Sequence, residues 1–347
     1  MRSIESVRAR AGQLARREPK DKASLTMSST RRPPELQAII EEIGRAGPFA
    51  SVEEINRVLA ARTREYNASP QAALGGLSPD EMGQLLYGDW MSQGALRLNN
   101  ALTLNELAEA PVLADARTLL DFVASEGPVK ETPARNLTRA AVASLLPRLR
   151  IPTQRPIAVD IGEPPPLNEG DLPWLPALRH TMMFGGLLMR RKGLRITSRG
   201  RELLHPDRAG ELYALLFLTV FRELDLRVFS RDDGHAGLQS TIAYSFYKLR
   251  PAARDWRSSE ALAEAAWLES AKDPATEWEA HNVDFRHYAF RHRVLDPLVQ
   301  FGLLEERVLP TEERWKELIE FRLTPLFDRF LRFEFRRQMA RDPFLTR

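Results

Sequence analysis

The spacing of apolar residues predicts that this chain is built mainly from helices. The first helix is expected where apolar residues recur at i, i+3, i+4 and i+7, the period of one helical face: Leu36, Ile39, Ile40 and Ile43. A second helix is predicted to begin after Ser51, because Glu54 three residues later completes a capping box. Ser78, followed by proline and two acids, predicts the start of a third helix. Residues 33–110 are therefore expected to form a small helical N-terminal region.

The next stretch, residues 112–205, combines helices with two short strands. Helical periodicity and turn residues predict four helices, at residues 114–125, 136–146 and 174–184 and from Ser198 onward. Extended apolar residues on both sides of Lys192-Gly193 predict a β-hairpin with strands 187–190 and 194–197. Between the second and third helices, residues 151–173 are rich in proline and acids. This composition excludes regular structure and predicts a long loop.

The same order of residues recurs near the C-terminus. The run FGGLL at residues 184–188 is echoed by FGLL at 301–304, and residues 194–204 are echoed by 321–331. Such self-similarity indicates a repeated structural unit. We expect the second unit at 276–347. Three helices are predicted to link the units within residues 206–275: 210–224, 238–249 and 258–270.

Three helices followed by a hairpin are the order of a winged-helix domain, and residues 112–205 resemble that family. The resemblance implies a three-helix core with a basic wing. The expected fold class is thus mainly α with short β-hairpins, containing two winged-helix-like units plus helical N-terminal and linking segments. The layout, with Arg135-Asn136-Leu137-Thr138 at the start of the second helix, also loosely resembles uncharacterised bacterial and plasmid-borne proteins that contain winged helices.

Composition adds limits on size, chemistry and location. With 347 residues, of which 43% are hydrophobic and 28% charged, the chain is expected to fold into several packed domains. It contains no cysteine, which excludes disulfides, thiolate nucleophiles and iron–sulfur clusters. Its longest apolar run, Leu212–Phe221, is shorter than the ~18 residues that span a bilayer. We expect a cytoplasmic protein with no membrane partner, in which this run forms a buried helix.

Positive charge is clustered although the net charge is only +3. Residues 1–32 are basic and lack the apolar core of a secretory signal, so a disordered tail is predicted. Met27 is an alternative start, which leaves open whether residues 1–26 belong to the native protein. A second cluster lies on the third helix and the wing of the first winged-helix-like unit: Arg179, His180, Arg190, Arg191, Lys192, Arg195, Arg199 and Arg201.

The second cluster is our candidate nucleic-acid-binding site. Winged helices that bind DNA usually place the third helix in the major groove and contact the backbone with the wing, and arginine suits phosphate oxygens. An alternative is that these arginines form a solvated face that discourages strand pairing. The third helix is also poor in Asn, Gln and Ser, which favours burial over base reading. A protein–protein interaction scaffold or adaptor, through a partner or self-association, therefore remains open.

The sequence offers no recognisable catalytic centre. Phosphate-binding, dinucleotide-binding and nucleophile-elbow motifs are all missing from the sequence. His281, His287 and His292 are spaced by six and five residues, which does not place them on one helical face, so no metal site is expected. We therefore predict a non-enzymatic protein with no cofactor and no small-molecule substrate.

Aromatic residues and arginines alternate near the C-terminus, from Leu326 to Phe335. Aromatics beside arginines can stack nucleic-acid bases. At helical spacing, however, the pattern favours a core face opposite a solvated charged face.

Overall fold

The computed structural model describes residues 41, 45, 51–150, 167–172, 174–230, 234–272, 285–310 and 318–336. The chain divides into two compact units, Met1–Glu65 and Tyr66–Arg347. The predicted tail, nearly all of the first predicted helix and most of the proline-rich loop lie outside the described residues.

The described part of the chain is mainly helical, with short antiparallel strand pairs, which confirms the prediction of a mainly α fold with short β-hairpins. The first half contains α3 (Val52–Ala68), α4 (Pro79–Tyr87), β1 (Leu96–Leu98), α5 (Pro111–Glu126), α6 (Arg139–Leu145), α7 (Trp174–Phe184), β2 (Leu188–Arg190), β3 (Leu194–Ile196) and α8 (Ser198–Leu203). The second half contains α9 (Ala209–Leu218), α10 (Gly237–Ser240), α11 (Ile242–Ala252), β4 (Arg257–Ser258), α12 (Ser259–Ala266), α14 (Phe285–Phe290), α15 (Asp296–Gln300), β5 (Leu304–Leu309), β6 (Leu318–Leu323), α16 (Pro325–Phe330) and β7 (Leu331–Phe333).

The predicted helix starts are formed by the predicted caps. The backbone N–H of Glu54 donates to Ser51 Oγ at 3.2 Å, one residue before α3. Ser78 and Glu81 form a complete capping box at the start of α4. Each cap satisfies backbone N–H groups that have no partner inside the helix, which is why these polar residues fix where the helices begin.

The core of the second unit is centred on α9. The apolar run Leu212–Phe221 forms this helix and the start of the π-helical turn η5 (Thr219–Glu223), and most of its side chains are buried, as predicted. Phe217 packs edge-on against Phe301 and Phe330 at centroid distances of 5.2 and 5.1 Å. Such contacts add to the hydrophobic stabilisation that comes from burying large rings. Phe301 and Phe330, from the C-terminal part of the chain, therefore pack directly against α9.

A first small sheet lies beside α5. Strands β2 and β3 form the predicted hairpin, with Met189 opposite Arg195. Val129, just after α5, exchanges two backbone hydrogen bonds with Leu194 of β3, at 2.8 and 2.9 Å. The order across the sheet is therefore Val129, β3, β2, and α5 packs against β3, α6 and α7.

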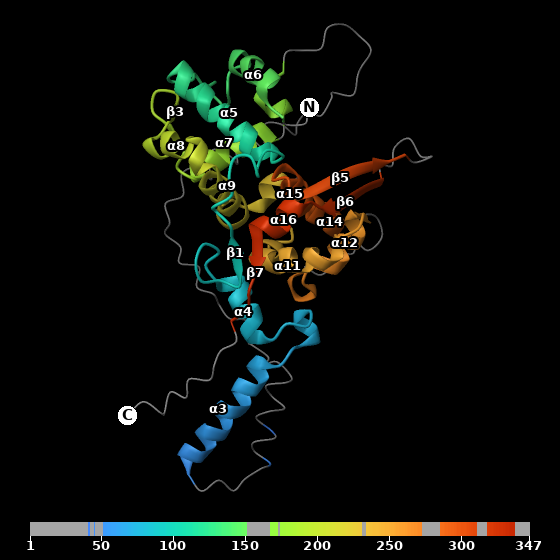
Figure 1. Ribbon diagram of the computed structural model, residues 1–347. Helices are drawn as coiled ribbons and strands as arrows, with labels where there is room; N and C mark the ends of the chain where they lie inside the picture. The colour runs from blue at the N-terminus through green and yellow to red at the C-terminus, as the bar shows by residue number, and fades with distance from the viewer. Residues whose placement is uncertain are drawn as a thin grey trace. The chain divides into compact units, whose positions relative to one another are not determined.

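A second sheet has the same strand order. Strand β4, from the segment expected to link the units, pairs with β6, and β6 pairs with β5. The long β5–β6 hairpin is drawn in red-orange in Figure 1. The order β4, β6, β5 matches Val129, β3, β2 in the first sheet. The predicted boundaries at 110, 205 and 275 stay predictions.

The repeat seen in the sequence corresponds to repeated local geometry. Gly186 and Gly302 follow α7 and α15 with φ of 70° and 69°, a left-handed conformation that favours glycine. Thr197 and Thr324, at the ends of β3 and β6, donate their hydroxyls to the carbonyls of these glycines, at 2.7 and 2.6 Å. The two segments thus make the same helix-to-strand connection.

Two predicted elements differ from the structure. The C-terminal helix does not continue to Phe335: α16 ends at Phe330, and β7 follows because its backbone pairs with β1 (Figure 1). The aromatic residues there are buried or packed against Tyr247, which confirms that they belong to the core. The loop predicted for 151–173 ends earlier, since Glu169–Asp171 form a 3-10 turn, η3, capped by Asn168.

Candidate nucleic-acid interface

The turn between β2 and β3 presents two cations to solvent. Arg191 donates its backbone N–H to the carbonyl of Gly193 at 2.9 Å, and Lys192 and Gly193 have positive φ of 55° and 111°. A Cβ at Gly193 would lie 2.9 Å from the carbonyl oxygen of Val129, so only glycine fits beside the neighbouring strand. The close turn leaves Arg191 and Lys192 exposed.

Arg179 is not available to a nucleic acid. Its side chain is only 1% exposed, and its Nε lies 2.6 Å from Glu169 Oε1. Its Nη1 also lies 3.5 Å from Glu131 Oε1. A buried guanidinium needs such partners because an unpaired charge in the interior is costly. Arg179 is therefore removed from the predicted binding set.

Arg190 and His180 are also removed from the predicted binding set. Arg190 donates its Nε to Glu131 at 2.9 Å and an Nη2 to the carbonyl of Arg135 at 3.2 Å. Burial, followed by the charge of Arg179, lowers the pKa of the partly buried His180. His180 is consequently neutral at pH 7 and offers no charge to a phosphate.

Four predicted cations remain exposed and gathered in one place. Arg191, Lys192, Arg195 and Arg201 line a concavity of about 470 Å³, and none of them forms an ion pair with a described residue. We call these four residues the wing cations. The rest of the lining is apolar: Val123, Ala124, Gly127, Met189 and Ile196. The eighth predicted residue, Arg199, is exposed but lies outside this lining and donates to the Gly185 carbonyl at 3.0 Å.

Helix α7 does not offer a face for base reading. Six of its eleven residues are buried, and Phe184 at its end is the large apolar side chain it exposes. Trp174 at its start stacks on Phe229 at a centroid distance of 5.1 Å. The prediction that this sequence suits burial is confirmed.

In the second hairpin, both arginines of the described strands are paired with glutamates, whereas the first hairpin is cationic. Across β5 and β6, Arg322 pairs with Glu305 and Arg307 pairs with Glu320, at 2.7 and 2.5 Å. The guanidinium groups of Arg307 and Arg322 also lie over the Trp256 ring, 4.5 and 4.7 Å from its centroid, respectively. Cation–π contacts and ion pairs together hold these arginines against their own sheet.

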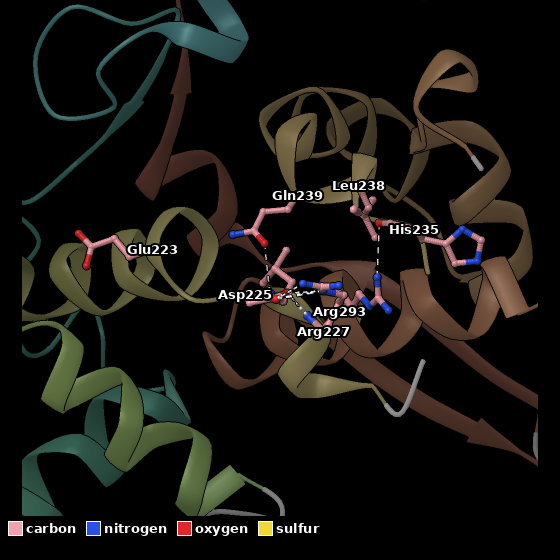
Figure 2. A pocket seen from close by; sticks show the side chains of 9 residues that line it. Glu223, Asp225, Arg227, His235, Leu238, Gln239 and Arg293 are labelled. Carbon is pink, nitrogen blue, oxygen red and sulfur yellow. Dashed lines mark hydrogen bonds and ion pairs between the residues drawn. The ribbon is translucent and has the colours of Figure 1, made fainter. Parts of the chain in front are cut away.

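A separate cavity of about 270 Å³ lies beside the turn η6 (Leu226–Phe229), as Figure 2 shows. Several of its polar side chains bond to one another or to nearby backbone carbonyls. Asp225 accepts from Arg227, which lowers the pKa of the carboxyl, and Gln239 donates to the Leu224 carbonyl at 2.6 Å. Arg293 donates to the Gly234 carbonyl at 2.7 Å. The cavity is explained by the packing of this loop.

Neither a metal-binding cluster nor a membrane-spanning helix is found among the described residues. Within them, no group of three or more histidine or acidic side chains is arranged to hold a metal ion. His292 contacts Asp296 at 2.6 Å, whereas His281 lies outside the described residues. In the same part of the chain, no helix combines the length and apolar character needed to cross a membrane.

Two acidic residues that matter here were missed by sequence reasoning. Glu131 and Glu169 neutralise Arg179 and Arg190, although they lie 10 to 59 positions away from them. Their sequence spacing carries no periodic signal that would have paired them.

Comparison of the chain with protein-family models, with curated proteins and with solved structures finds no match.

Proposed function

We propose that this protein binds DNA through backbone contacts made by the wing cations. The supporting observation is that Arg191, Lys192, Arg195 and Arg201 surround one concavity and have no carboxylate partner among the described residues. Unpaired cations that converge on one surface are suited to phosphate oxygens. In the comparable β5–β6 hairpin, by contrast, Arg307 and Arg322 form ion pairs with Glu320 and Glu305 of the same hairpin.

The proposed module is a winged helix. Helix α5, the Val129 strand position, α6, α7 and the β2–β3 hairpin follow one another in the order of that fold, with Val129 beside β3. We propose the same assignment for α11, β4, α12, the α14–α15 segment and the β5–β6 hairpin. Because α7 is buried, the proposed binding is independent of base sequence. The proposed protein is non-enzymatic and cytoplasmic.

Four phosphate contacts would give a recognisable dependence on salt. Each neutralised phosphate contributes about −0.9 to the slope of log affinity against log salt, so four contacts give a slope of about −3.6. Affinity for duplex DNA should then fall about 100-fold between roughly 50 and 200 mM salt.

The test is fluorescence anisotropy with a duplex of random sequence at both salt concentrations. Replacing the four wing cations by alanine should abolish most of the affinity and flatten the salt dependence. A matched control removes four exposed arginines from other elements, Arg57, Arg64, Arg254 and Arg332. Equal losses in both variants would show only an effect of net charge and would refute the site, and no binding by the wild type would refute the function.

A protein-interaction role is the second candidate, and the β5–β6 hairpin supports it. Val308 is 60% exposed, and Leu318 is also exposed near the end of the described strands. The arginines of the same two strands are neutralised by ion pairs with glutamates. An exposed apolar surface with little net charge suits a protein partner. A complex that survives high salt and is lost in the Val308→Asp variant would support this role over DNA binding.

A further inference from the structure

The concavity bounded by the wing cations has an unusual lining. Every charged residue in it is a cation, and all the others are apolar or glycine. The cavity beside η6, by contrast, mixes acids with arginines. A lining of this kind matches a ligand that carries both negative charge and an apolar part.

We infer that this concavity binds one unstacked nucleotide of a single-stranded nucleic acid, with the phosphates on the wing cations and the base on the apolar floor. The inference rests on the proposed function and names the form of nucleic acid that fits best. A volume of about 470 Å³ lies within the range of small-ligand sites.

The cations approach the concavity from different elements. Arg191 and Lys192 come from the β2–β3 turn, Arg195 from β3 and Arg201 from α8. A nucleotide inside a strand carries a phosphate on each side of its sugar, so cations on more than one side of the floor can be used together. The C-terminal end of α5 also contributes to the lining, but its dipole is worth only about half a negative charge. A clear positive excess remains.

The apolar floor distinguishes a single strand from a duplex. Met189 is 42% exposed on the outer face of β2, opposite Arg195 in the hairpin register. In a duplex the bases stay stacked inside and only sugars and phosphates would reach this surface. In a single strand a base can turn outward and cover the exposed thioether, which adds affinity without any base-specific hydrogen bond.

The experiment compares a labelled 12-nucleotide single strand with its duplex by anisotropy at one salt concentration. Wild-type protein should prefer the single strand. Met189→Ala should weaken single-strand binding about five-fold, because less apolar surface is buried by the base, and should leave duplex binding unchanged. Met91→Ala is the matched control, because Met91 is 40% exposed and lies outside the concavity, and it should change neither affinity.

The outcomes separate this inference from the proposed function. Duplex binding that depends on the wing cations, with no effect of Met189→Ala on the single strand, would overturn the inference and leave the function standing. No binding to either form would overturn both. Free ATP should compete only at concentrations far above those of the strand. Competition by ATP at the same concentration as the strand would point to a free nucleotide as the ligand. Equally tight binding to acidic phosphatidylglycerol vesicles would point to an anionic lipid surface. Either result would overturn the inference.

Discussion

Replacing Glu169 by alanine should be among the most damaging single changes to the second unit. The side chain of Glu169 is fully buried and contacts the Arg179 guanidinium at 2.6 and 3.2 Å. It also accepts the backbone N–H of Leu137 at 2.7 Å. The Glu169→Ala variant leaves Arg179 buried with only the longer contact to Glu131, at 3.5 Å. Breaking a buried pair in this way costs about 3–5 kcal/mol.

The loss in the free energy of unfolding is measurable by urea denaturation, and the accompanying change in Tm by thermal melting, both followed through tryptophan fluorescence. The unfolding entropy of a domain is about 2.1 cal/mol/K per residue, so this loss corresponds to a drop in Tm of about 5–8 °C for residues 66–347. The Arg179→Met variant should lose a comparable amount. The double variant Glu169→Leu/Arg179→Met should recover much of it, because two apolar side chains leave no uncompensated charge.

The control is an ion pair on the surface. Arg208 pairs with Glu202 and Glu211 on exposed helix ends, where solvent screens the charges, so Arg208→Ala should cost far less stability than Glu169→Ala. If Glu169→Ala costs no more than Arg208→Ala, or if the double variant is as unstable as the sum of the two single variants, the argument from buried charge is wrong.

Two further predictions concern packing and pH. Gly200→Ala should destabilise the protein by about 1–3 kcal/mol, because its Cβ would lie 2.4 Å from the Leu187 carbonyl oxygen. Gly83→Ala in α4, where no such contact exists, should stabilise it by about 0.5–1 kcal/mol, and thermal melting of both variants tests the contrast. The lowered pKa of His180 means that the unfolded chain binds its proton first as pH falls below the ordinary histidine pKa of 6.5. Wild-type stability should therefore be fully present above about pH 6.5 and decline below it, and His180→Gln should reduce this decline between about pH 7.5 and 5.5. An identical pH profile in the variant would show that His180 does not contribute.

Local sequence was enough to place most elements. Caps such as Ser78 and apolar periodicity such as that of α7 act over three or four residues, so they can be read without knowing the fold. The hairpin at Lys192-Gly193 and the burial of Leu212–Phe221 were predicted for the same reason.

Tertiary structure decided the rest. Phe330 ends α16 because the following residues find a strand partner in β1, more than 200 positions earlier in the chain. Glu131 and Glu169 neutralise Arg179 and Arg190, burial lowers the pKa of His180, and Arg199 lies outside the concavity, so four of the eight predicted residues remain around it. The sequence by itself determined where helices and turns form, since those depend on near neighbours. Only the folded chain determined which charges are neutralised, because that depends on which distant residues share a low-dielectric site.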